Sequence, residues 1–409
     1  MSYCADSLWV LSKAIEINAV ADGKYALQHR LNGRRFELDQ RSADYARLFS
    51  QQTRLLDGQQ QSNLATDTVM TVHQYLVNNG ILLPVDADVD TRQLLSFSAP
   101  TVPLFGASRC LNFNQHHAGQ LCLFGAPFAA SFPATLGCRQ ASSSLRQYAQ
   151  KIGINLHTSA VRQLANLCQV PPDYSFRTLQ ARVDAGLLDC GDLQISPFES
   201  AALAQQKIAL TWRSCLAKGL VPVMLGGDHS VTYPALQAVS TQHPAFYVLH
   251  LDAHSDTYWS GTDQIYGDAV PPHHANFMAL ALRDFPQIRQ VVQVGLRGLA
   301  NFNLPESPRQ HVIWANDLQI GPAVFPDPTL PIYITLDLDV LDPIWLPGTG
   351  EALPGGLSLT QLALLLRDIC RHRRVIGLDM VELNPALDDS GRSVKTALEA
   401  LLLLMNSGE

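Results

Sequence analysis

The pattern of apolar and polar positions divides the chain near residue 120. Before that point, the first 84 residues predict a small module of strands and helices. Its strand-like segments are residues 8–20, 25–31 and 35–38, with Asn32-Gly33 between the last two. Asn-Gly between strand-like segments is the strongest short signal for a β-hairpin. Two stretches with helical spacing follow, and we expect the module to fold on its own.

From residue 121 onward, short apolar runs rich in β-formers alternate with helical patterns. The runs are residues 121–124, 220–225, 246–251, 291–294, 331–336 and 375–378. The helical stretches include residues 197–216, 360–372 and 394–404. Buried strands that alternate with helices are typical of a parallel sheet covered on both faces. We therefore predict one α/β domain over residues 121–409, joined to the N-terminal module by a linker over residues 85–120.

Composition narrows the class of protein. Of 409 residues, 47% are apolar and 16% are charged, which is enough apolar material for a large core. The formal charge of −7 argues against nucleic acid or an anionic membrane surface as a partner. We find neither a membrane-spanning stretch nor a signal peptide, and the eight cysteines form no C-x-x-C pair. We expect a cytoplasmic protein with reduced thiols.

Three of the predicted strands are followed by residue types that commonly act as metal ligands. The sequences at these ends are Gly226-Gly227-Asp228-His229-Ser230, Asp252-Ala253-His254-Ser255-Asp256 and Asp337-Leu338-Asp339. In an extended chain, residues i and i+2 point the same way, and the carboxyl ends of parallel strands meet at one edge of the sheet. Four carboxylates and two imidazoles therefore converge: Asp252, Asp256, Asp337 and Asp339, with His229 and His254.

This set of side chains suits two divalent ions. Four carboxylates nearly balance the charge of two such ions, and oxygen-rich ligation with some imidazole favours Mn²⁺ over a thiolate-type zinc site. A pair of metals about 3.5–4 Å apart activates a shared water at neutral pH. Each motif alone is more often a turn or an unremarkable strand end. Three of them, each directly after a buried strand, are much harder to obtain by chance.

With further segments, these motifs resemble the ureohydrolase family of arginases, agmatinases and related guanidino hydrolases. The further segments are Gly125-Ala126-Pro127, Asp189-Cys190-Gly191-Asp192, residues 346–356 and residues 379–385. The resemblance implies an arginase-like fold, a parallel sheet flanked by helices on both faces, in a homo-oligomer, a trimer or a hexamer. It implies hydrolysis of a guanidinium to urea and an amine, with two Mn²⁺ ions as cofactors. One ion would be held by His229, Asp252, Asp256 and Asp337, and the other by Asp252, His254, Asp337 and Asp339.

The resemblance also implies roles for residues near the metals. Glu382 matches the glutamate that holds the guanidinium, a planar cation suited to bidentate pairing with a carboxylate. A histidine after the second metal motif serves the family as a proton shuttle. Either His273 or His274 occupies that place, and we favour His274. We expect His274, Asp256 and Glu382 as catalytic residues, and Glu382, His273 and Asn276 as substrate contacts. We interpret His250 as a supporting or core residue.

The sequence departs from arginases at the far end of the substrate. Arginases bind the α-amino group of free arginine with an aspartate just after a Gly-Leu-Arg segment. Here Gly295-Leu296-Arg297 is followed by Gly298-Leu299-Ala300, without an acidic residue. The loop after the second metal motif lacks the usual Ser-Gly-Asn, and Asp256-Thr257-Tyr258 is closer to the agmatinase type. We expect a guanidinium substrate whose far end is not a zwitterion.

The N-terminal module is not part of ordinary ureohydrolases. Its hairpin-then-helices order resembles the winged-helix-like RiPP recognition element, which binds the leader of a ribosomally made precursor peptide by adding it as a strand. Together the two departures predict a peptide arginase of RiPP biosynthesis, which converts peptidyl arginine to peptidyl ornithine and urea. One alternative is a small-molecule guanidino hydrolase, with an accessory domain for oligomerisation or stability. Another is a non-enzymatic metal-binding peptide carrier, against which the complete ligand set argues.

Overall fold

The computed structural model divides the chain into two compact units, residues 1–96 and residues 97–409. Within the described residues, none of the helices is both long and apolar enough to cross a bilayer. The residues described are 8–11, 15–29, 35–79, 81–84, 97–98, 100, 102–110, 113, 116, 118–129, 133–158, 160–196, 199–258, 270–302, 304, 307–318 and 324–408.

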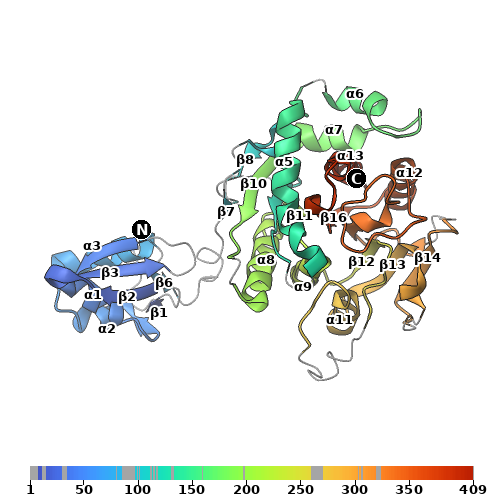
Figure 1. Cartoon of the computed structure of the whole chain (residues 1–409). Coiled ribbons are helices and arrows are strands. Elements are labelled where there is room, and N and C mark those ends of the chain that lie inside the picture. Colours follow the sequence, from blue (N-terminus) through green and yellow to red (C-terminus); the bar gives the residue numbers. More distant parts are fainter. Residues whose placement is uncertain are drawn as a thin grey trace. The chain divides into compact units, whose positions relative to one another are not determined.

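The described residues of the first unit form two small antiparallel sheets and three α-helices (Figure 1). One sheet has the order β5-β1-β6 and the other the order β2-β3-β4. The strands are β1 (Leu8–Leu11), β2 (Ile15–Ala19), β3 (Lys24–His29), β4 (Arg35–Asp39), β5 (Thr53–Arg54) and β6 (Leu82–Pro84). The helices are α1 (Gln40–Arg47), α2 (Leu55–Gln60) and α3 (Thr66–Asn78).

The first unit has a core of its own. Trp9, Tyr45, Phe49 and Leu76 are buried together, and the Tyr45 hydroxyl lies 3.0 Å from Nδ1 of His73. The predicted hairpin strands are confirmed as the antiparallel pair β3 and β4, whereas its Asn-Gly turn lies outside the described residues. The sequence pattern did not predict α2, because this short helix carries a glycine and mostly polar residues.

The second unit is built on one large sheet with the order β14-β13-β12-β15-β16-β11-β9-β10-β7, and β8 pairs with β10. All neighbours are parallel except β7, which is antiparallel to β10. The strands are β7 (Phe97–Ser98), β8 (Ser108–Arg109), β9 (Leu121–Gly125), β10 (Leu187–Leu193), β11 (Val221–Leu225), β12 (Phe246–Leu251), β13 (Ile288–Leu296), β14 (Gln310–Trp314), β15 (Ile332–Asp337) and β16 (Val375–Val381).

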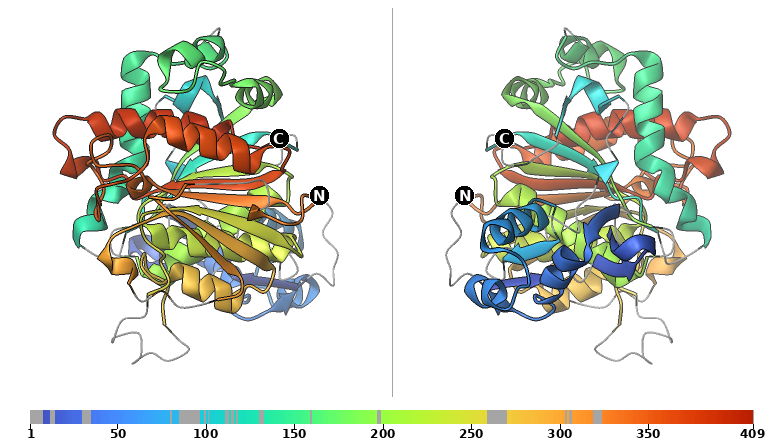
Figure 2. Two further views of the ribbon diagram at one scale, coloured as in Figure 1. Left: turned by 90° about the vertical axis from the view of Figure 1, so that its right-hand side faces the viewer. Right: turned by 90° about the vertical axis from the view of Figure 1, so that its left-hand side faces the viewer.

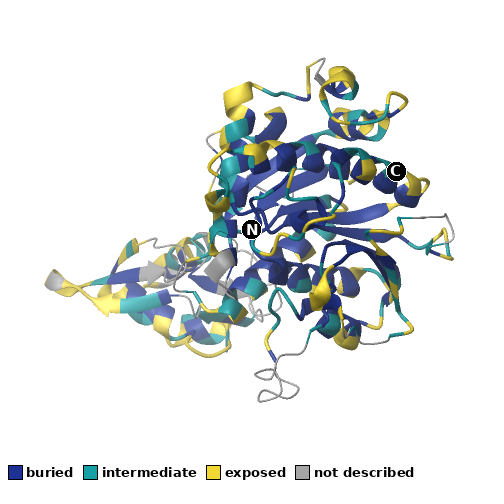
Figure 3. Ribbon diagram, turned by 45° about the vertical axis from the view of Figure 1, so that its right-hand side comes forward, coloured by how far each residue is buried: buried dark blue, intermediate teal, exposed yellow. Residues whose placement is uncertain are grey.

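Helices cover both faces of this sheet (Figure 2). Helices α5, α12 and α13 pack together on one face, and α8, α9 and α11 on the other. The helices are α5 (Ala141–Ile152), α6 (Ala160–Leu167), α7 (Arg177–Ala185), α8 (Ala201–Leu216), α9 (Thr232–Gln242), α11 (Phe277–Asp284), α12 (Leu359–Cys370) and α13 (Arg392–Met405). Between these layers the central strands are buried along their length, which accounts for their continuous apolar runs (Figure 3).

The predicted parallel sheet with helices on both faces is therefore confirmed, and four of its strands, β7, β8, β10 and β14, were not predicted. Strand β10 carries two aspartates, and the buried Asp189 carboxylate pairs with Arg146 of α5, 2.8 Å away, and accepts from the backbone N–H groups of Leu104 and Gly191. Strand β14 lies at the edge of the sheet and keeps a half-polar pattern. Residues 97–98 and 108–109, within the predicted linker, pair with β10.

Candidate active site

Four neighbouring strands of the large sheet bring the predicted ligands together. Asp252 directly follows β12, Asp337 ends β15, and His229 begins a 3-10 turn (His229–Val231) shortly after β11. Because β12, β15, β16 and β11 are consecutive in the sheet, their carboxyl ends meet at one edge. The Asp228 side chain accepts a hydrogen bond from the backbone N–H of Ser230, which fixes the turn that presents His229. The expected convergence is present.

The first cluster surrounds Nδ1 of His229. Carboxylate oxygens lie 2.9 Å (Asp256), 3.1 Å (Asp252) and 3.1 Å (Asp337) from this atom. The Nδ1 atom is buried, and among the described residues it makes no hydrogen bond of acceptable geometry. Donor atoms about 3 Å apart around one point are the spacing expected of ligands bound about 2.1 Å from a shared ion. These residues therefore fit a divalent cation.

The second cluster lies beside the first and shares one carboxylate with it. Nδ1 of His254 lies 2.8 Å from an oxygen of Asp339 and 3.5 Å from Oδ1 of Asp252. Oδ2 of Asp252 faces His229 instead, so one carboxylate faces both imidazoles. The Asp339 backbone N–H donates to Asp337, which holds the third motif at the same place. The two clusters fit a binuclear metal centre.

The buried charges of the two clusters favour the binding of a cation. Burial raises the pKa of Asp337 well above its ordinary value, and the charges of Asp339 and Asp252 raise it further. Burial opposes the charge of His229 as well, but its carboxylate neighbours outweigh this and hold its pKa well above the usual range. A site of this kind gathers negative charge that a bound divalent ion neutralises.

Two residues of the site have left-handed backbone conformations. Asp256 has φ of 51° and Glu382 has φ of 62°. Residues other than glycine rarely adopt such angles, and the strain is tolerated where surrounding structure determines it. At Glu382 the surroundings include a hydrogen bond from its backbone N–H to the Gly227 carbonyl. Both carboxylates are thus turned inward at the ends of their segments.

Buried polar partners orient the imidazole of His229. Its Nε2 lies 2.9 Å from the Thr335 hydroxyl, which donates in turn to a carboxylate oxygen of Asp379, 2.5 Å away. Asp379 is buried in β16 and also accepts from Thr232 and Tyr333. Sequence reasoning did not assign Thr335 or Asp379 to the site, although an aspartate inside the apolar run of β16 is a signal for a buried polar role.

His250 supports Asp252 in a similar way. Nε2 of His250 lies 2.8 Å from Oδ2 of Asp252, while the Gln293 amide N–H donates to Nδ1 of His250 over 2.9 Å. Because Nδ1 accepts, the network assigns the ring proton to Nε2, which donates to Asp252. This arrangement fits a residue that orients a ligand carboxylate.

A cavity of about 220 Å³ opens against the two clusters. It is lined by Thr135, His229, His254, Asp256, Tyr258, His274, Ala275, Ala300, Asp337, Asp339, Thr349, Glu351 and Glu382. Oε1 of Glu382 accepts from the backbone N–H of His229 over 2.8 Å, and its Oε2 lies 3.3 Å from the Cys138 thiol. Burial, together with the nearby charge of Asp228, raises the pKa of Glu382.

His274, predicted as catalytic, and His273 and Asn276, predicted as substrate contacts, lie in different positions. His274 lines the cavity, whereas His273 is not among the described lining residues. Asn276 is buried at the start of α11, where its side chain accepts from the His273 backbone N–H and donates to the Pro271 carbonyl. The structure therefore brings His274 to the cavity and places Asn276 within the loop that carries it.

The mouth of the cavity has few charged groups. Ala300, three residues after the Gly-Leu-Arg segment, lines the wall, and Tyr258 donates its hydroxyl proton to Asn301. The Arg297 guanidinium is turned away to backbone carbonyls, including those of Asp339 and Leu353. Among the described lining residues there is neither lysine nor arginine, and Glu351 is the exposed acid.

Comparison with known proteins points to one family. A model of the arginase family matches residues 119–406. The chain is 32% identical over 231 residues to the mitochondrial guanidino acid hydrolase of Homo sapiens, covering 53% of this chain and 63% of that protein. It is 30% identical over 235 residues to the guanidinobutyrase of Pseudomonas aeruginosa, covering 54% and 70%. The solved structure of proclavaminate amidino hydrolase from Streptomyces clavuligerus aligns with a TM-score of 0.57 and 26% identity, over 75% of this chain and 97% of that one. The chain thus spans just under two thirds of the length of the first relative.

Proposed function

The chain belongs to the arginase family, and from that premise we propose that it hydrolyses a guanidinium group to urea and an amine. The observation that carries this proposal is a carboxylate, Glu382, in the same 220 Å³ cavity as two clusters that fit metals. A guanidinium at the end of a substrate could then contact the Glu382 carboxylate and a metal-activated water at the same time.

The residues divide the chemistry among them. Bound at the His229 and His254 clusters, two divalent ions, with Mn²⁺ favoured by the donor set, supply a water activated at neutral pH. Glu382 pairs with the planar guanidinium and orients its carbon. His274 lines the cavity and donates a proton to the departing amine nitrogen. Thr335 and His250 keep ligands of both clusters in place.

For the substrate we propose arginine within a peptide, which yields peptidyl ornithine and urea. A free arginine brings an α-ammonium and an α-carboxylate to the mouth of the cavity. At the mouth, Ala300 provides a methyl group, and the described lining residues include no cation for a carboxylate. A peptide bond on each side of the arginine removes both charges, including the α-carboxylate, for which the described lining offers no lysine or arginine.

The first unit supports the same substrate. It has its own core and sheets, and the family match begins at residue 119, beyond its end. The strands β2 and β4 form the two edges of a three-stranded antiparallel sheet, and an exposed edge can accept an extended peptide as a further strand. We propose that this unit binds the leader of a precursor peptide and so raises the effective concentration of its arginines.

A second candidate substrate is a small guanidino amine of the agmatine type. Glu351 favours it, because an exposed carboxylate at the cavity wall offers a counter-charge for a free amine. In that case the first unit has a role unrelated to substrate.

Urea release by the Mn²⁺-loaded full chain separates these candidates. Free arginine, agmatine and a leader-bearing peptide with arginine are assayed in parallel. We expect urea from the peptide, with a mass loss of one CH₂N₂ unit for each arginine converted. Turnover of agmatine with an inert peptide would overturn the peptide proposal and leave the guanidino hydrolase intact. Inactivity towards every guanidino compound in the metal-loaded state would overturn both.

A further inference from the structure

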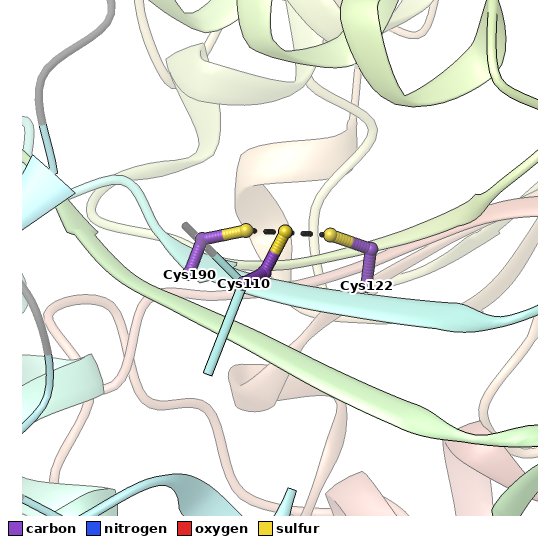
Figure 4. A group of neighbouring side chains, drawn as sticks. All are labelled: Cys110, Cys122 and Cys190. Carbon is purple, nitrogen blue, oxygen red and sulfur yellow. Dashed lines mark hydrogen bonds between the residues drawn. The ribbon is translucent and has the colours of Figure 1, made fainter. Parts of the chain in front are cut away.

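Away from the catalytic cavity, three cysteines from separate segments bring their sulfur atoms together. Cys110 follows β8, Cys122 lies in β9 and Cys190 lies in β10. Their three sulfur atoms lie within 4.8 Å of one another, and those of Cys122 and Cys190 are 3.4 Å apart. Figure 4 shows the Cys110 sulfur between the other two. The parallel pairing of β10 with β8 on one side and β9 on the other sets this arrangement.

The surroundings of the cluster are buried and rich in soft ligands. The three residues are 6%, 0% and 3% exposed, respectively. The backbone N–H of Cys110 donates to the Asp189 carbonyl over 3.0 Å, which fixes this cysteine beside β10. His116 hydrogen-bonds Cys110 through its side chain and is half-buried. A fourth thiol, Cys215 of α8, has its sulfur 3.9 Å from that of Cys122.

We propose that Cys110, Cys122 and Cys190 bind a thiophilic divalent cation such as zinc, and that His116, which contacts Cys110, moves closer to become the fourth ligand. Zinc bound by thiolates at about 2.3 Å in tetrahedral geometry separates its sulfur atoms by about 3.8 Å. The 3.4 Å between Cys122 and Cys190 requires a small outward shift to reach this value. It is far longer than the roughly 2.05 Å of a disulfide bond. Binding converts the thiols to thiolates and releases their protons to solvent.

The site would join a segment that precedes the family match to two strands within it. Cys110 and His116 precede residue 119, where the match to the arginase family begins, while Cys122 and Cys190 lie within the match. A bound ion would therefore fasten the preceding segment to β9 and β10. Its thiolate donors select zinc, whereas the carboxylates and imidazoles of the catalytic clusters favour manganese. Because zinc can also bind carboxylates and imidazoles, the Asp252→Asn variant is needed to separate zinc at the thiolates from zinc at the catalytic clusters.

Metal content of the full chain tests this proposal. The reduced protein is loaded with Mn²⁺ and Zn²⁺, dialysed against a weak chelator and measured by elemental analysis. We expect one retained zinc ion per chain in the natural sequence and in Cys215→Ser, the matched control for a neighbouring buried thiol. Cys190→Ser and Cys110→Ser should weaken zinc binding by more than the roughly 10- to 100-fold that changes around metal ligands cause. Asp252→Asn should keep this zinc, since it alters the catalytic clusters instead.

Cobalt substitution gives a second readout that does not depend on activity. Thiolates bound to Co²⁺ produce an intense charge-transfer absorption in the near ultraviolet, which carboxylate and imidazole ligands do not. We expect this band in the natural sequence and its loss in Cys190→Ser, with folding of each variant checked by circular dichroism. If Cys190→Ser fails to fold, Cys110→Ser at the edge of the sheet provides the same comparison. A natural protein that retains no zinc and shows no such band, or whose cluster purifies as a disulfide, overturns the proposal.

Discussion

The floor and the mouth of the cavity are built in opposite ways. At the floor, buried ionisable residues crowd around two points, and partners from neighbouring strands orient them. At the mouth, Ala300 and Tyr258 line the wall and Glu351 is the exposed charge. Under the proposed function, the reaction depends on the buried residues of the floor. The peptide proposal has the substrate selected by the lack of a cation at the described mouth and by the first unit.

The largest expected effect comes from removing the carboxylate that serves both clusters. Asp252→Asn should lower urea production by about 1,000-fold or more, roughly 4 kcal/mol of transition-state stabilisation, with loss of bound manganese. The control is Asp368→Asn, because Asp368 is an exposed acid of α12 paired with its neighbour Arg367. Full activity of metal-free Asp252→Asn protein would contradict the assignment of the two clusters as metal sites.

Replacing the proposed proton donor, His274, should give the next largest effect. His274→Asn should reduce kcat by about 100-fold with little change in KM, since a positioned acid contributes at least this much. His273→Asn serves as the matched variant and should change kcat little, because His273 is not among the described residues that line the cavity. Steady-state kinetics on one substrate compare the two. The reverse order of effects would assign the shuttle to His273.

Glu382, the carboxylate proposed to hold the guanidinium, should give a smaller effect, and it contrasts directly with the mouth. Glu382→Gln should lower kcat/KM by about 30-fold for every guanidino substrate, as expected from losing a charge-assisted hydrogen bond worth about 2 kcal/mol. Glu351→Gln should leave turnover of a blocked arginine peptide unchanged, because such a peptide has no free amine to pair with it. Equal losses of kcat/KM in Glu382→Gln and Glu351→Gln would contradict the different roles given to the floor and the mouth.

The smallest effect concerns the thiol that contacts Glu382. Cys138→Ala should lower kcat/KM by about fivefold, mainly through KM, because one neutral hydrogen bond to the carboxylate is lost. Cys138→Ser keeps a donor and should restore most of the affinity. If the two variants behave alike, the thiol serves packing rather than the position of Glu382.

Local sequence patterns predicted the metal clusters better than their supports. The aspartates and histidines after β12 and β15 are spaced at i and i+2, so the direction of one strand end decides where they point. The contact between Thr335 and His229 instead joins residues 106 positions apart, and that between Cys138 and Glu382 joins residues 244 apart. Such pairings depend on strand order, which no local pattern contains.

The same limit applies to β10 and to the cysteine cluster. Strand β10 carries Asp189, whose buried carboxylate pairs with Arg146 of a distant helix, so an apolar run could not reveal it. Cys190 lies in that unpredicted strand, and the pairing of β10 with β8 and β9 brings it to Cys110 and Cys122. Scattered cysteines therefore suggested free thiols, whereas the fold gathers three of them.

One pair of substrates tests the contrast between floor and mouth most directly. Free arginine and arginine blocked by an acetyl group and an amide carry the same guanidinium, and blocking replaces both α charges by neutral amides. Urea release by the manganese-loaded full chain gives kcat/KM for each. We predict that the blocked arginine is the better substrate, because the described wall offers no cation for the α-carboxylate. A clear preference for free arginine would contradict the account and place a zwitterion at the mouth.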